Sequence, residues 1–141
     1  MSANTEHLRS LEPLLGTWKV EGPGTSGTVQ YAWPDFDGWM LQHIRIVAGT
    51  QPTRGLELIG YDAETGTLRS RFFGSGGELL EYTYVLEGRV LTIYHGGTDS
   101  PAKFVGTFND DFTVNTGAWS WPGGGYESTM TKQTEGSDVP E

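Results

Sequence analysis

The sequence predicts one antiparallel β-barrel of about ten strands, closed in up-and-down order, with a short N-terminal helix. Three observations favour this all-β fold. The chain has 141 residues, which suits one domain with one core. Its 21 glycines follow no collagen-like period and are typical of a chain with many turns. From Gly16 onward, apolar and polar residues alternate in short runs with a period of two.

The helix is expected over residues 5–15, before the first strand. Apolar residues recur there at helical spacing, at Leu8, Leu11 and Leu14. Thr5 is placed to cap the helix, and Pro13 limits it to two or three turns.

Ten runs then have the alternation of strands and are separated by turn residues such as Asp, Asn and Gly. Because the connections are short, consecutive strands should pair as a meander, and closure would leave no exposed strand edge. We expect the domain to span residues 1–133 and the polar tail, residues 134–141, to be disordered. The predicted strands are 16–22, 27–34, 39–48, 54–62, 67–73, 78–86, 89–95, 102–109, 112–121 and 126–132.

The alternation can be followed through the turns to predict which side chains face the interior. A four-residue loop at 35–38 pairs Trp33 with Met40 and Tyr31 with Gln42. If the loop at 49–53 preserves the alternation, Leu58 and both arginines of the next run face inward, whereas Glu57 and Ser70 face outward. The residues predicted to bind a ligand are Tyr31, Trp33, Met40, Gln42, Leu58, Arg69, Arg71, Phe73, Tyr82, Tyr84, His95 and Trp119.

The composition excludes some classes of binding partner and cofactor. A net charge of −9 disfavours binding to nucleic acid and to anionic membrane surfaces. There is no cysteine, and the three histidines have no metal-ligand spacing, so we expect neither a metal site nor a cofactor. The absence of a signal-like or membrane-spanning segment predicts a cytoplasmic protein, monomeric or homodimeric.

Two stretches resemble the calycin proteins, which include lipocalins and fatty-acid-binding proteins. Their first strand is similar to Leu14-Leu15-Gly16-Thr17-Trp18. The middle of lipocalin-like bacterial domains is similar to Ile59-Gly60-Tyr61-Asp62 and Phe72-Phe73-Gly74-Ser75-Gly76-Gly77. Those bacterial domains have no general assigned activity. The resemblance implies a ligand-holding barrel whose Gly-x-Trp tryptophan packs across one end. Nitrobindin-like relatives bind haem through a histidine late in the barrel. This chain has no histidine after His95, so the resemblance does not imply haem binding here.

Three functions fit these features, of which haem or flavin binding is the least favoured. In the first, the barrel binds an amphipathic molecule whose polar end can be anionic. Arg69 and Arg71 share one face of a strand and, with Tyr82, resemble the carboxylate clamp of fatty-acid-binding proteins. Alternatively, these arginines face outward and pair with Glu57, Glu78 or Glu81.

The second function is a cofactor-independent isomerase, cyclase or dehydratase in the same cavity. Tyr82 or Tyr84 would donate the proton, His95 would accept one, and an arginine would stabilise developing negative charge.

Overall fold

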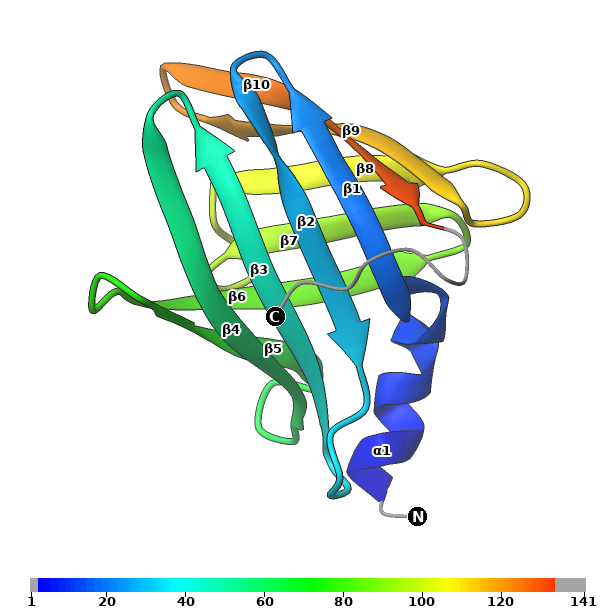
Figure 1. The fold of residues 1–141 in the computed structure, drawn as a ribbon. Coiled ribbons are helices and arrows are strands. Elements are labelled where there is room, and N and C mark those ends of the chain that lie inside the picture. The colour runs from blue at the N-terminus through cyan, green and yellow to red at the C-terminus, as the bar shows by residue number, and fades with distance from the viewer. Residues whose placement is uncertain (1–2, 134–141) are drawn as a thin grey trace.

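The computed structural model describes residues 3–133, which form a closed antiparallel barrel with a short helix at the N-terminus (Figure 1). Each strand pairs with its neighbours in sequence, and β10 returns to pair with β1. The predicted fold class is therefore confirmed, whereas the predicted disordered tail lies outside the described residues. The strands are β1 (Gly16–Gly22), β2 (Thr25–Ala32), β3 (Trp39–Ala48), β4 (Gln51–Asp62), β5 (Thr67–Gly74), β6 (Leu79–Glu87), β7 (Val90–His95), β8 (Lys103–Phe108), β9 (Val114–Trp121) and β10 (Gly124–Lys132).

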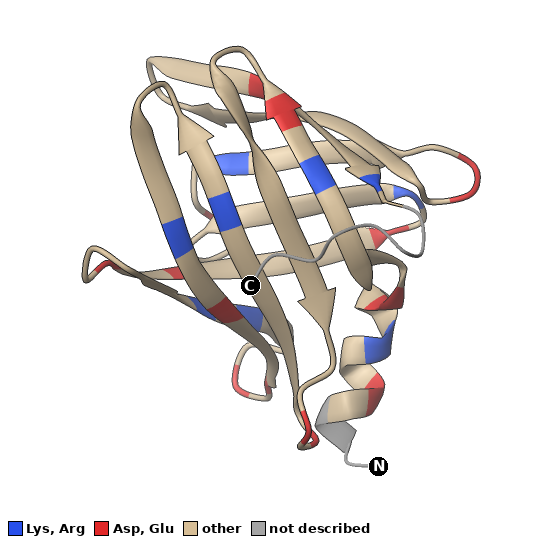
Figure 2. Cartoon of the chain, in the orientation of Figure 1, with Lys and Arg blue, Asp and Glu red and all other residues tan. Residues whose placement is uncertain are grey.

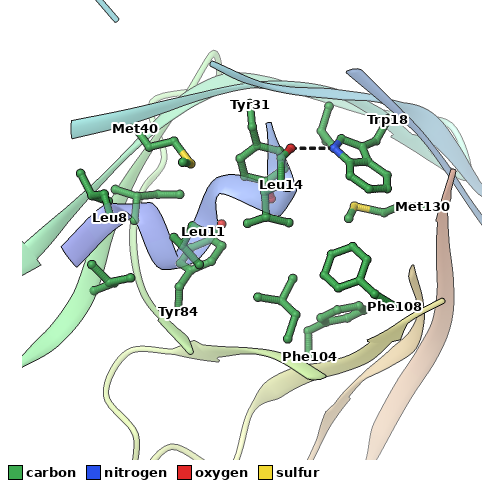
Figure 3. Packing of buried hydrophobic residues seen from close by; sticks show 14 of the residues in the cluster. Leu8, Leu11, Leu14, Trp18, Tyr31, Met40, Tyr84, Phe104, Phe108 and Met130 are labelled. Carbon is green, nitrogen blue, oxygen red and sulfur yellow. Dashed lines mark hydrogen bonds between the residues drawn. The ribbon is translucent and has the colours of Figure 1, made fainter. Parts of the chain in front are cut away.

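The N-terminal segment consists of α1 (Ala3–Leu8), which continues as the 3-10 helix η1 (Arg9–Leu14). Its three leucines at helical spacing, Leu8, Leu11 and Leu14, are fully buried against the barrel (Figure 3). Thr5 does not precede the helix as predicted, because α1 already begins at Ala3. Its hydroxyl instead accepts a hydrogen bond of 2.9 Å from the backbone N–H of Gly38 and so joins the helix to the β2–β3 connection.

Trp18 anchors the core at the helix end of the barrel (Figure 3). Its side chain is fully buried, and its indole N–H donates a 2.7 Å hydrogen bond to the carbonyl of Leu14. The ring packs against Phe108 with centroids 5.8 Å apart, and the Lys132 ammonium lies 5.3 Å from the indole. Trp18 therefore fastens the helical segment to the first strand.

The β3–β4 turn decides which residues of the middle strands face inward. Ala48 pairs with Gln51, so the turn contains only two residues, and its Gly49 has a positive φ of 64°. The expected loop at 49–53 is therefore wrong, and Pro52 lies within β4. Because β5 pairs with β4 only from Gly55 onward, the proline has no neighbouring strand on that side and disrupts no ladder there.

This turn reverses the expected orientation of β4 and β5. Gln42 lies opposite Glu57, which brings Glu57 into the barrel and turns Leu58 outward. The β5–β6 connection restores the expected orientation. Phe73 pairs with Leu79, whereas the expected loop would have paired it with Glu78. The two departures cancel, so β6 and β7 face as predicted.

Candidate functional site

The N-terminal helix covers one end of the barrel, whereas inward-facing residues near the other end are partly exposed. Inward-facing side chains at the helix end are buried, as Met40 and Leu91 at 0% exposure show. At the opposite end, Tyr126 is 41% exposed although its strand register places it on the inner face with Trp119. Solvent therefore reaches inward-facing side chains at this end. We define the mouth as the inward-facing aliphatic and aromatic side chains that remain partly or fully exposed there: Ile44, Ile46, Leu80, Tyr82, Ile93, His95, Trp119, Trp121 and Tyr126.

Aromatic rings dominate the mouth. Tyr82 on β6 contacts His95 edge-on with ring centroids 5.3 Å apart, and it contacts Trp119 on β9 at 6.1 Å. Phe104 supports Trp119 from β8 at 5.6 Å. Since β7 and β8 separate β6 from β9 in the barrel, the contact between Tyr82 and Trp119 bridges the interior. The mouth thus offers large apolar ring surfaces to an entering molecule.

A buried polar cluster lies on the inner wall formed by β2 to β6. Glu57 is 3% exposed and is the only acidic or basic residue that is buried within residues 3–133. The Ser70 hydroxyl donates a 2.5 Å hydrogen bond to the Glu57 carboxylate. The Tyr84 hydroxyl also hydrogen-bonds Glu57, and it lies 3.4 Å from the side-chain oxygen of Gln42. We call Glu57, Ser70, Tyr84, Gln42 and the adjoining Tyr31 the Glu57 cluster.

Burial controls the protonation of this cluster. Loss of solvation raises the pKa of Glu57, while the hydrogen bonds from Ser70 and Tyr84 act in the opposite direction. Burial, followed by the negative charge of Glu57, also raises the pKa of Tyr31 and Tyr84. The same two causes raise the pKa of Tyr82 to about 12, so the field of Glu57 reaches the mouth. The phenols are neutral donors at physiological pH, and any charge that Glu57 carries is negative.

The structure brings together most of the residues predicted to bind a ligand. Seven of the twelve face the interior, four face outward and one follows the end of a strand. The inward residues are Tyr31, Met40, Gln42, Tyr82, Tyr84, His95 and Trp119. The outward residues are Leu58, Arg69, Arg71 and Phe73. Trp33 comes directly after β2 and is 37% exposed, so its predicted pairing with Met40 is not formed.

The predicted carboxylate clamp inside the barrel is wrong. Arg69 and Arg71 lie on the outer wall, because the short β3–β4 turn reversed their strand. Each is close to Glu81, at 3.6 Å and 3.4 Å respectively, as the alternative interpretation of these arginines expected. Together with outward apolar side chains such as Trp39 and Phe73, they line an external hollow of about 620 Å³.

Because this ion pair is exposed, Arg71→Ala is expected to change the free energy of unfolding by about 1 kcal/mol or less. The Arg71 side chain is 67% exposed, so solvent and salt screen its interaction with Glu81. Urea unfolding at low and high salt measures the effect. A loss of several kcal/mol would show that Arg71 contributes to the core after all.

Sequence reasoning missed several polar residues of the interior, among them Glu57, Ser70 and Asn115. The first two were assigned to the outer face by the same error at the β3–β4 turn. A two-residue turn at Gly49 would have placed Gln42 opposite Glu57, and such a pair of hydrogen-bonding side chains is a usable signal. Asn115 could have been found by following the alternation back from Trp119 along β9.

Charged residues otherwise lie outside the barrel. Acidic residues gather at the helix and the strand ends, whereas most basic ones lie along the strands (Figure 2). Within residues 3–133, no group of three or more His, Cys, Asp or Glu side chains is arranged to hold a metal ion. No helix in the same range is long and apolar enough to cross a membrane.

The fold and this interior define a closed antiparallel β-barrel with an aromatic mouth above a buried carboxyl group. Comparison with known protein families and with characterised proteins found no match to the chain.

Proposed function

We propose that the protein is a calycin-type binding protein that holds a small amphipathic molecule in its barrel. The ligand enters through the mouth, lays its apolar body against the aromatic rings and directs its polar end toward the Glu57 cluster. One observation carries the proposal: inward-facing aromatic side chains remain partly exposed above a buried hydrogen-bonding group. An apolar concavity with a few converging polar groups is typical of small-molecule sites.

The charges of the interior favour a neutral or cationic polar end. An anionic ligand was expected because Arg69 and Arg71 were expected inside, and both lie on the outer wall. An anion would instead approach the carboxyl group of Glu57, whose field already raises the pKa of Tyr82. Like charge at short range in a poorly solvated interior is unfavourable.

The same finding weighs against the enzyme hypothesis. His95 and Tyr82 do meet at the mouth, with ring centroids 5.3 Å apart. The arginine that was to stabilise developing negative charge is absent from the interior, because both candidates face outward. Binding without turnover is therefore the better supported function.

Trp119→Ala is expected to weaken binding of the neutral fluorescent probe N-phenyl-1-naphthylamine about tenfold, which corresponds to ~1.4 kcal/mol of lost ring contact. Trp119 lies inside the mouth against Tyr82 and Phe104. Fluorescence titration measures the dissociation constant. Trp39→Ala is the matched control, because Trp39 lies on the outer wall and is 43% exposed.

Two results would contradict this function. Absence of saturable probe binding to the unmodified protein would leave the interior without a demonstrated capacity for ligands. An equal loss of affinity in both tryptophan variants would show that the probe binds somewhere other than the mouth.

A further inference from the structure

Asn115 has an unusual environment on the inner wall of β9. Its side chain is fully buried, at 0% exposure. Neither its amide nitrogen nor its amide oxygen has a hydrogen-bond partner among residues 3–133. Buried amides are nearly always hydrogen-bonded, so this group is expected to meet a donor and an acceptor from elsewhere.

The surroundings of Asn115 leave it facing the barrel interior. Its neighbours across the strands are the apolar residues Phe108 and Met130, which cannot satisfy an amide. The next inward position on β9 toward the mouth is Gly117, which pairs with Gly106. Neither glycine has a side chain, and the Asn115 amide oxygen lies over Gly106 together with the Phe104 ring, in space that a larger residue at position 106 would fill.

The position of β9 places Asn115 across the barrel from the Glu57 cluster. In the ring of ten strands, β9 and β4 are five strands apart in either direction. Asn115 and Glu57 therefore belong to opposite walls of one interior, one wall with an unpartnered amide and the other with a carboxyl group already bonded to Ser70. A ligand between the walls would find its free hydrogen-bonding capacity at Asn115.

We infer that the ligand of the proposed function carries a carboxamide or lactam edge, a neighbouring N–H and C=O, that pairs with the Asn115 amide. The N–H of the ligand donates to the Asn115 oxygen, and its carbonyl accepts from the Asn115 nitrogen. This inference rests on the proposed function, because the ligand must first occupy the interior. A buried water molecule is the competing partner, since water also donates and accepts.

The test compares 2-naphthamide with methyl 2-naphthoate, which share the ring system, while the ester lacks the N–H donor. Both are titrated by calorimetry against the unmodified protein and against Asn115→Leu. The ratio of amide to ester affinity is expected to fall about tenfold in the variant, since its leucine can neither donate nor accept. The melting temperature of unliganded Asn115→Leu is expected to rise by about 2–4 °C, because an unsatisfied buried amide has been removed.

A second measurement uses the unmodified protein alone and does not depend on the folding of the variant. In a nitrogen-15 proton correlation spectrum, the side-chain NH₂ signals of Asn115 should shift with 2-naphthamide and move much less with the ester. Asn109, whose side chain already hydrogen-bonds Thr113 on the surface, supplies an internal reference amide that should stay in place.

The results of these experiments distinguish a failure of the Asn115 inference from a failure of the proposed binding function. If both compounds bind but the affinity ratio is the same in the variant, and the Asn115 signals do not respond to the amide, the partner is water. The inference then fails while the binding function stands. If neither compound binds, both fail together.

Discussion

Replacing Trp18 with alanine is expected to lower the free energy of unfolding by about 3–5 kcal/mol, the range found when a buried aromatic side chain is truncated. The side chain is fully buried, packs against Phe108 and donates a 2.7 Å hydrogen bond to the Leu14 carbonyl. Alanine would leave a cavity beside the helix and an unpaired carbonyl. Urea unfolding followed by circular dichroism gives the free energy.

Two further variants separate the causes of this loss. Trp18→Phe keeps most of the ring but removes the indole donor, and we expect it to cost about 1–3 kcal/mol through the carbonyl left without its partner. Trp121→Ala is the control for removing any tryptophan, because that side chain is 44% exposed; we expect about 1 kcal/mol or less. Similar losses for Trp18→Ala and Trp121→Ala would mean that Trp18 does not anchor the helix.

The importance of Trp18 could be predicted before any coordinates, and so could the fold. The Gly16-Thr17-Trp18 segment resembles the start of calycin barrels, where the tryptophan packs across one end, and Trp18 is indeed buried beside the helix. The strands follow from period-two alternation bounded by Asp, Asn and Gly turns. The positions of strands can be predicted from such local signals, because the alternation of each strand is visible in its own residues.

The faces of β4 and β5 could not be predicted in this way, because strand register depends on turns. Pro52 suggested a loop, since proline removes a ladder donor. In the structure it occupies the part of β4 that extends past β5, where no donor is required on that side. One misplaced turn exchanges every inward residue for an outward one, which is why Arg69 and Arg71 were expected inside and Glu57 outside.

The second error concealed the first. The β5–β6 connection is also displaced by one residue, so Tyr82 and Tyr84 were placed correctly for a reason that does not hold. The candidate site could thus be predicted where aromatic residues line it. Glu57 was expected outside because the β3–β4 turn reversed its strand, and Asn115, although inward by alternation from Trp119, interrupts the apolar pattern that marks an inner face.

Glu57→Gln is expected to stabilise the barrel by an amount that grows as the pH rises above about 4.5. Burial raises the pKa of Glu57 in the folded state from its ordinary value of 4.5. Between the unfolded and folded pKa values, the folded protein retains a proton that the unfolded chain has released. The unfolded state then binds fewer protons, so the free energy of unfolding of the unmodified protein falls with pH.

The size of the effect has a physical ceiling. One proton changes stability by at most about 1.4 kcal/mol per pH unit, and the fall ends once the pH exceeds the folded pKa. Glutamine retains the shape of the carboxyl group and an oxygen that accepts from Ser70 and Tyr84. It does not titrate, so the stability difference between Glu57→Gln and the unmodified protein isolates this one group from the other ionisable residues.

Urea unfolding at half-unit steps from pH 4.5 to 8 measures that difference. Glu81→Gln is the matched control for exchanging a carboxyl group for an amide, because that side chain is 50% exposed on the outer wall. A difference that stays constant or shrinks over this range would mean that the hydrogen bonds of Ser70 and Tyr84 outweigh burial and keep Glu57 ionised. In that case the folded barrel would hold a permanent negative charge opposite Asn115, and a cationic polar end would be favoured over a neutral one.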